Sequence, residues 1–177
     1  MTPILGIIAS SYPRVTNSYE SIATVNASGS SSISFSSIAS TWKHLQIRAA
    51  YSQSATGQTN LRFNSDTGSN YTYHQLLGTG SAASAAAGTA QVAALIAYDN
   101  KANSTYPATF VCDILDYQNT NKYKTVRTLA GTEQNSADGL IIFRSNLWLN
   151  TSAVTSITIY PDSGTFTGSF ALYGIKG

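Results

Sequence analysis

Polar and hydrophobic residues alternate with a period of two along most of the chain. In residues 43–49, Lys43, Leu45, Ile47 and Ala49 fall on one side of an extended backbone, and the polar residues His44, Gln46 and Arg48 fall on the other. The same alternation returns in residues 156–160 and 169–175. Because successive side chains of a β-strand point to opposite faces, this pattern predicts strands with one buried face and one face in water.

Eleven such runs, each ending in a cluster of turn-forming residues, are predicted to be strands. They cover residues 19–26, 31–36, 42–51, 60–64, 71–77, 91–98, 108–116, 123–130, 139–148, 154–160 and 169–175. Eleven short strands separated by turns favour two packed sheets over a small barrel. The sequence therefore predicts an all-β fold, a jelly-roll-like two-sheet β-sandwich.

Two segments break the alternation. Residues 81–88 are rich in alanine, the best helix former, but contain serine and glycine, so we expect a loop with at most one helical turn. Residues 4–13 are apolar and precede the first predicted strand. We therefore divide the chain into an N-terminal arm, residues 1–16, and a single sandwich domain, residues 17–177. The sandwich does not need the arm for its own core, so the arm is expected to dock on a partner.

Charged residues make up only 10% of the 177 residues, and ten basic against eight acidic side chains give a formal net charge of +2. A surface with so little charge repulsion suits a protein that packs against copies of itself or a larger assembly. The basic residues are spread along the chain, so no nucleic-acid partner is expected. The opening apolar run lacks a basic start and is too short to cross a bilayer, so we expect neither secretion nor a membrane partner.

Candidate catalytic groups are few. His44 and His74 are the only imidazoles, and no Gly-x-Ser-x-Gly motif accompanies them. Asp113 and Asp116 lie three residues apart, on opposite faces of a strand, which does not suit a carboxylate pair for glycoside hydrolysis. Asp113 lies inside an apolar run and is expected to pair with Arg127 or Arg48. The sequence therefore predicts no enzyme.

Metal and cofactor sites are also not expected. Residues 64–70 place oxygen-bearing side chains at alternate positions around a glycine, but the bidentate glutamate of a calcium loop is missing, so this segment is predicted to be a hairpin turn. Cys112 is the only cysteine and is predicted to be a buried, inert thiol. No phosphate-binding glycine motif occurs, so no cofactor is expected.

Tyrosine is abundant, with 11 residues. Their rings could form a platform for sugars or for a neighbouring subunit, and about half of them are expected to be simple cross-strand pairs. The tyrosines considered are Tyr51, Tyr71, Tyr73, Tyr98, Tyr106, Tyr117 and Tyr123.

Several blocks, taken together in order, resemble a recurring set of small structural proteins of tailed-phage virions. The blocks are residues 17–25 (NSYESIATV), 33–38 (ISFSSI), 42–48 (WKHLQIR), 62–66 (RFNSD), 113–117 (DILDY), 119–122 (NTNK), 147–152 (LWLNTS) and 170–176 (FALYGIK). The likeness covers nearly the whole chain after the first sixteen residues. It implies a non-enzymatic virion module, found alone or near the ends of fibre-like proteins in phages of aquatic bacteria.

From this resemblance we expect a capsid decoration, or cement, protein on the head exterior, which binds the major capsid protein. Weak charge repulsion and the symmetry of three-fold capsid sites further predict a homotrimer. The expected contacts on the arm are Ile4, Leu5, Ile7, Ile8 and Tyr12. The alternative is a tail-fibre module whose loops, rich in asparagine, serine and tyrosine, recognise host-surface glycans. A depolymerase is disfavoured, because it would need the catalytic groups that the sequence lacks.

Overall fold

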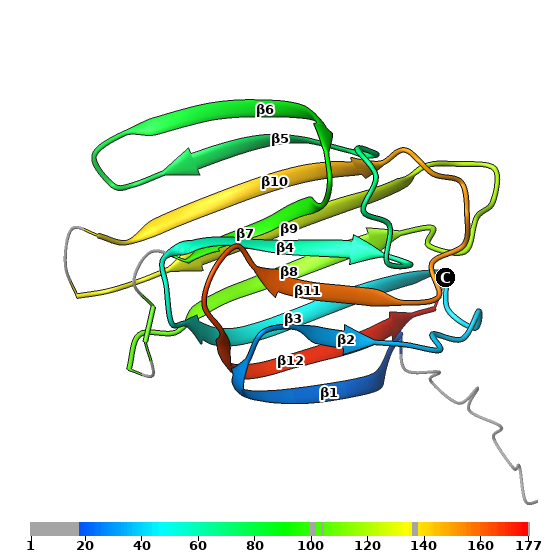
Figure 1. The fold of residues 1–177 in the computed structure, drawn as a ribbon, viewed down its shortest axis with the longest axis horizontal. Helices are drawn as coiled ribbons and strands as arrows, with labels where there is room; N and C mark the ends of the chain where they lie inside the picture. Colours follow the sequence, from blue (N-terminus) through cyan, green and yellow to red (C-terminus); the bar gives the residue numbers. More distant parts are fainter. Residues whose placement is uncertain (1–17, 100–101, 104, 136–137, 177) are drawn as a thin grey trace, which may run out of the picture.

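The computed structural model describes residues 18–99, 102–103, 105–135 and 138–176, which contain twelve strands and no helix (Figure 1). The strands are β1 (Tyr19–Ser30), β2 (Ile33–Phe35), β3 (His44–Gln53), β4 (Gly57–Phe63), β5 (Tyr71–Gly78), β6 (Ala83–Gln91), β7 (Ala94–Asp99), β8 (Ala108–Leu115), β9 (Lys124–Thr132), β10 (Leu140–Trp148), β11 (Ile157–Pro161) and β12 (Phe166–Ile175). No helix of the described part is long and apolar enough to cross a membrane.

The strands form two antiparallel sheets of unequal size. The larger sheet has the order β1-β12-β3-β8-β9-β10-β5-β6, and the smaller has the order β2-β11-β4-β7. Figure 1 shows the small sheet lying across the large one, while β5 and β6 project beyond it. The predicted all-β, jelly-roll-like sandwich is therefore confirmed. The proposed arm, residues 1–16, lies outside the described residues.

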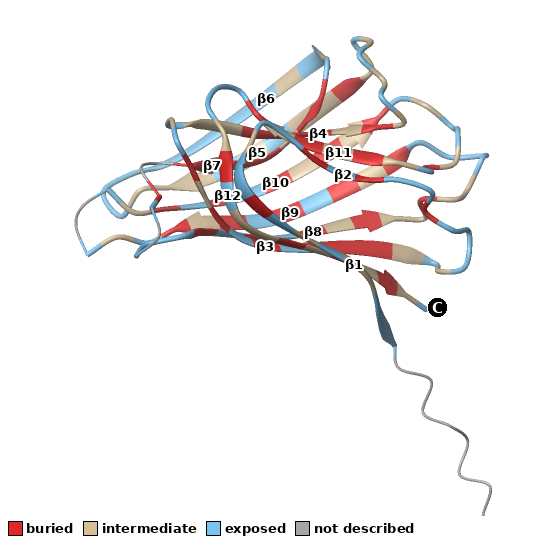
Figure 2. Cartoon of the chain, turned by 60° about the horizontal axis from the view of Figure 1, so that its bottom comes forward, coloured by how far each residue is buried: buried red, intermediate tan, exposed pale blue. Residues whose placement is uncertain are grey.

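All eleven predicted strands occur, with shifted ends, but the prediction for residues 81–88 was wrong. Most of this alanine-rich segment belongs to β6, a strand at the edge of the large sheet that pairs with β5. Its side chains are exposed on both faces, as Figure 2 shows along most of its length. Backbone pairing with β5 therefore overrides the weak helical preference of alanine in this segment.

The core lies between the two sheets, where the alternate residues of each central strand meet. Leu45, Ile47, Ala49 and Tyr51 of β3 are buried, whereas Arg48 and Ala50, which alternate with them, are exposed. The Tyr51 ring packs edge-on against Phe110 and Phe166, with centroids 5.8 and 5.4 Å apart. Such aromatic clusters contribute about 0.5–1.5 kcal/mol per pair beyond the area they bury.

Two buried polar side chains of β10 join the sheets. Asn146 exchanges two hydrogen bonds with the backbone of Leu95 in β7, at 3.0 and 3.1 Å. Arg144 donates from Nη1 to the carbonyl oxygen of Ala97 at 3.0 Å and from Nε to Gln75 Oε1 at 3.0 Å. Burial lowers the pKa of Arg144 to about 10. Because β7 is the edge strand of the small sheet, these side chains satisfy backbone groups that would otherwise be unpaired.

Candidate interaction surface

One row of apolar residues crosses the outer face of the large sheet. Leu129 of β9 is paired with Val111 of β8 on one side and with Phe143 of β10 on the other. Phe143 is paired in turn with Leu76 of β5, and Leu76 with Ala85 of β6. Directly paired residues of antiparallel strands place their side chains on the same face. These five side chains therefore form one continuous strip, here called the apolar row.

The apolar row is exposed to solvent. The exposed fractions are 62% for Leu76, 53% for Leu129, 48% for Phe143 and 39% for Val111, and the neighbouring Ile141 of β10 is 58% exposed. Large side chains that are half exposed present on the order of 100 Å² each, so this patch offers roughly 500 Å² of apolar surface. The largest apolar patch on a typical soluble monomer measures about 300–600 Å² and is often functional, which makes this patch a candidate contact site.

Two hollows flank the middle of the apolar row. One of about 540 Å³ is bounded by Leu76, Ala85 and Phe143. The other, of about 650 Å³, is bounded by Val111 and Leu129 of the row together with Ile141. The face is therefore uneven and apolar, which is the shape that a protein partner with matching side chains can fill.

A polar row runs beside the apolar row on the same face. Gln46 of β3 donates from Nε2 to Asp113 Oδ1 at 2.7 Å and accepts from Arg48 Nε at 2.7 Å. Asp113 is therefore not a charge inside the core, and its hydrogen-bond donor is Gln46. Of the two partners expected for Asp113, Arg48 donates to Gln46 and is linked to Asp113 through that side chain. Arg127 is the residue paired with Asp113 across β8 and β9.

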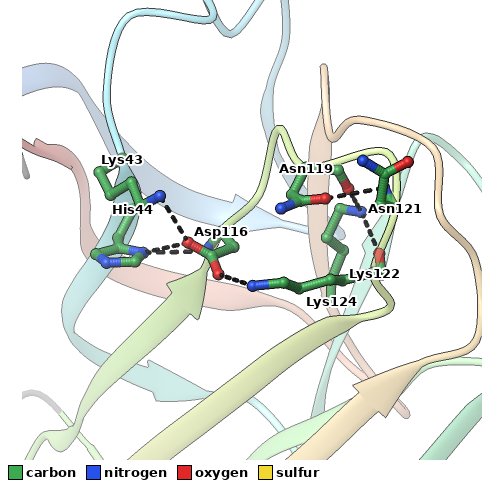
Figure 3. A network of polar contacts seen from close by, with 7 residues as sticks. All are labelled: Lys43, His44, Asp116, Asn119, Asn121, Lys122 and Lys124. Carbon is green, nitrogen blue, oxygen red and sulfur yellow. Dashed lines mark hydrogen bonds and ion pairs between the residues drawn. The ribbon is translucent and has the colours of Figure 1, made fainter.

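His44 and Asp116 meet at one end of the sandwich, in the network of Figure 3. His44 Nδ1 accepts a 2.9 Å hydrogen bond from the backbone N–H of Asp116, so that nitrogen carries no proton in this arrangement. The Asp116 carboxylate lies 3.2 Å from Lys122 Nζ and 3.5 Å from Lys43 Nζ. The hydrogen bond from Lys122 is the main cause that lowers the pKa of Asp116. This geometry ties a turn to a strand.

Lys124 fills the other half of the same network (Figure 3). Its ammonium group donates to the carbonyl oxygens of Asn119, Lys122 and Thr151 at 2.5, 2.8 and 3.0 Å. The residue is fully buried, and burial lowers its pKa. Three carbonyl oxygens satisfy all three N–H donors, which is what a buried ammonium requires. Lys124 thus joins two loops from within.

The remaining candidates for chemistry are structural. The carboxylate of Asp66 accepts hydrogen bonds from Gly68 N, Asn70 Nδ2 and Trp148 Nε1, so residues 64–70 form a turn. The prediction of a hairpin was wrong, because β4 and β5, which this turn connects, belong to different sheets. Cys112 is fully buried, as predicted, and burial raises the pKa of its thiol to about 12. The part of the chain that the structure describes brings no three metal-binding side chains together.

The tyrosines do not form one platform. Tyr51, Tyr71 and Tyr117 are fully buried, so these three rings do not contribute to a surface platform. Burial is the main cause that raises the pKa of Tyr51 and Tyr71. Tyr106 and Tyr123 are 39% and 51% exposed.

Sequence reasoning missed the residues of the apolar row. A signal was present in Leu140–Ile141–Ile142–Phe143, where four consecutive apolar residues cannot all point inward from one strand. Leu140 and Ile142 are buried, whereas Ile141 and Phe143 face outward. The arm contacts expected from sequence, Ile4, Leu5, Ile7, Ile8 and Tyr12, lie outside the described residues.

Comparisons of the chain with protein-family models, with curated proteins and with solved structures give no match.

Proposed function

We propose that this protein is a non-enzymatic structural subunit of a tailed-phage virion, a head decoration protein that works by contact with copies of itself and with the major capsid protein. The observation that carries the proposal is the apolar row. An outward face with Leu76, Leu129 and Phe143 about half exposed is unfavourable in water unless a partner covers it. The sequence resemblance supplies the virion as the assembly.

The size of the patch supports self-association. In a closed ring each copy places this face against a different surface of the next copy, so each contact would bury the roughly 500 Å² of the patch together with a matching area of the neighbour, which fits an interface of roughly 1,600 Å². The net charge of +2 opposes such contact only weakly. A homotrimer is the assembly we propose, because clamps at three-fold sites of a capsid need matching symmetry.

The variant Phe143→Ser tests self-association through the apolar row. The mass of each protein in solution is measured by light scattering at micromolar concentration. The unmodified protein is expected to have the mass of a trimer, and Phe143→Ser is expected to shift to the 18.7 kDa monomer. Tyr123→Ser is the matched control, because it removes a ring that is 51% exposed but lies outside the apolar row. A monomeric unmodified protein, or equal masses for both variants, would contradict self-association through this face.

The location is tested on particles. Gold-labelled antibody against the protein is expected on heads, and purified capsids lacking the protein are expected to take it up. Labelling confined to tails would exclude the decoration role.

Tail labelling would support the second candidate, a module that recognises host glycans. One observation favours it: a polar depression of about 440 Å³ on the small sheet, bordered by Tyr160, Asp162 and Asn60. Arg62 stacks over the Tyr160 ring, with its guanidinium carbon 4.5 Å from the ring centroid. Aromatic rings beside carboxylate and amide groups are suited to sugars. Loss of binding to host polysaccharide in Tyr160→Ala would be the expected result for this candidate.

A further inference from the structure

The strand β6 has one unpaired edge. It pairs with β5 on one side, and among the described residues no strand pairs with its other side. Its nine residues, ASAAAGTAQ, contain neither a charged residue nor proline, and nearly all of them are exposed. A row of free N–H and C=O groups on such a strand is a template for another strand.

The other three sheet edges are protected. β2 has only three residues. β7 receives side-chain hydrogen bonds from Asn146 and Arg144 along its free edge. β1 carries Glu20 and two register shifts in its pairing with β12, and such irregularities twist an edge away from new partners. Since the fold protects these edges and leaves β6 open, β6 is the place where a strand from outside can add.

The arm contains a segment that matches β6 in length and, like β6, carries no charge. Residues 4–12, ILGIIASSY, lie between Pro3 and Pro13 and have no charge. They number nine, like the residues of β6, and three of them are isoleucine, which favours extended structure. Proline cannot donate to a strand ladder, so Pro3 and Pro13 set the ends of any strand formed here.

We propose that residues 4–12 of one copy add as a strand to the free edge of β6 in a neighbouring copy. This inference rests on the proposed function, because the acceptor is a second copy of the chain. It assigns the arm a place within the assembly, where the main-chain hydrogen bonds of β6 give affinity.

The arm cannot reach β6 of its own chain. β1, which follows the arm, and β6 lie at opposite edges of the eight-stranded sheet. Seven strand spacings of about 4.8 Å separate them by roughly 34 Å along the sheet. The seven steps from Tyr12 to Tyr19 span at most about 25 Å when fully extended. Pairing of the arm with β6 is therefore intermolecular.

Donor and acceptor at opposite edges define a head-to-tail contact. Such a contact links each copy to the next and closes into a ring when the rotation between copies allows it. Three copies in a ring would give the proposed trimer, with all three β6 edges covered.

Disulfide trapping between separately prepared full-length variants tests the pairing. Ile7→Cys and Ile8→Cys serve in turn as donors, because adjacent strand residues point to opposite faces and one of the two matches the acceptor. Ala86→Cys is the acceptor, and Ser28→Cys, an exposed position on the opposite edge strand β1, is its matched control. The native Cys112 is buried and does not compete.

Mild oxidation of a mixture of a donor variant and Ala86→Cys is expected to give a disulfide-linked dimer. Its yield should be at least tenfold higher than the yield from the same donor variant mixed with Ser28→Cys. Adding Ile4→Pro to the Ile7→Cys or Ile8→Cys variant removes one backbone N–H from the added strand and is expected to lower the yield of the dimer. Three outcomes would overturn the inference. They are equal yields for the two acceptors, no cross-link in any mixture, and a dimer from Ala86→Cys alone, since the last would mean that β6 pairs with β6. If the unmodified protein still has the mass of a trimer in those cases, the proposed self-association stands and only the arm exchange fails.

Discussion

The indole Nε1 of Trp148 donates a 2.7 Å hydrogen bond to Oδ2 of Asp66, which lies 82 residues earlier in the chain. The same carboxylate accepts from the backbone of Gly68 at 2.8 Å and from Asn70 Nδ2 at 2.9 Å. Trp148 is itself almost fully buried, with its ring 5.3 Å from that of Phe63. The turn before β5 is thereby fastened to the end of β10.

Replacing Asp66 should release this turn. Asp66→Ala leaves the buried indole N–H of Trp148 without its acceptor, and an unsatisfied buried donor costs about 1–3 kcal/mol. We expect the free energy of unfolding in urea to fall by about 2–3 kcal/mol, since two further hydrogen bonds are lost. Thr67→Ala is the control, because Thr67 is exposed in the same turn. An equal loss in both variants would contradict the role given to Asp66.

Acid should weaken the same contact. Burial acts to raise the pKa of Asp66, but the hydrogen bonds from Trp148, Asn70 and Gly68 outweigh it, so the pKa is lowered overall. A carboxyl whose pKa is lower in the folded protein contributes stability above its unfolded pKa, about 3.9, and loses it as the pH falls further. Unfolding free energies measured from pH 6 to pH 2 should therefore fall more steeply for the unmodified protein than for Asp66→Ala. Parallel curves would contradict this assignment.

The sequence predicted the central strands because burial imposes a strict pattern there. In β3 and β8, every second residue is buried between the sheets, and the alternation of apolar and polar residues in the sequence predicts this burial. β6 carries no such pattern, because both of its faces are exposed and alanine favours a helix in isolation. Its structure depends on pairing with β5, which local sequence does not encode.

The contact surface was harder to foresee. Val111 and Leu129 lie 18 positions apart in the sequence, and only the register of β8 and β9 brings them side by side. The same applies to Lys124, whose three carbonyl partners come from two separate loops. Contacts between residues far apart in the sequence follow from the order of the strands in the sheet. The alternation of polar and apolar residues does not specify that order.

Lys124→Met tests the buried ammonium. Methionine has a similar length but cannot donate, so the carbonyl oxygens of Asn119, Lys122 and Thr151 lose their shared donor. We expect a loss of about 3 kcal/mol in unfolding free energy, since each buried unsatisfied acceptor costs about 1–3 kcal/mol. Lys122→Met is the control, because its side chain is 63% exposed and its ion pair with Asp116 contributes little. Equal stability of the two variants would show that the carbonyl oxygens are satisfied by water.

Gly168 tests how closely β12 approaches β3. It is paired with Tyr51 and has a φ of 143°, which L side chains rarely adopt. A Cβ atom there would lie 2.4 Å from the carbonyl oxygen of Ala50 and 2.5 Å from Tyr51 Cα, both of them backbone atoms that cannot turn aside.

A comparison with Gly29 distinguishes the cost of a strained backbone from the cost of a steric clash with the added Cβ atom. Gly29 also has a positive φ, 67°, but a Cβ atom there would meet nothing within 4 Å. Gly29→Ala should therefore lower the unfolding free energy by only about 1–2 kcal/mol, the cost of a left-handed backbone for a residue with a Cβ. Gly168→Ala adds a collision in a packed core, which typically costs a further 1–3 kcal/mol. Chemical denaturation of the two variants should show the larger loss in Gly168→Ala, and a smaller loss there would mean that β12 and β3 can move apart without weakening the core.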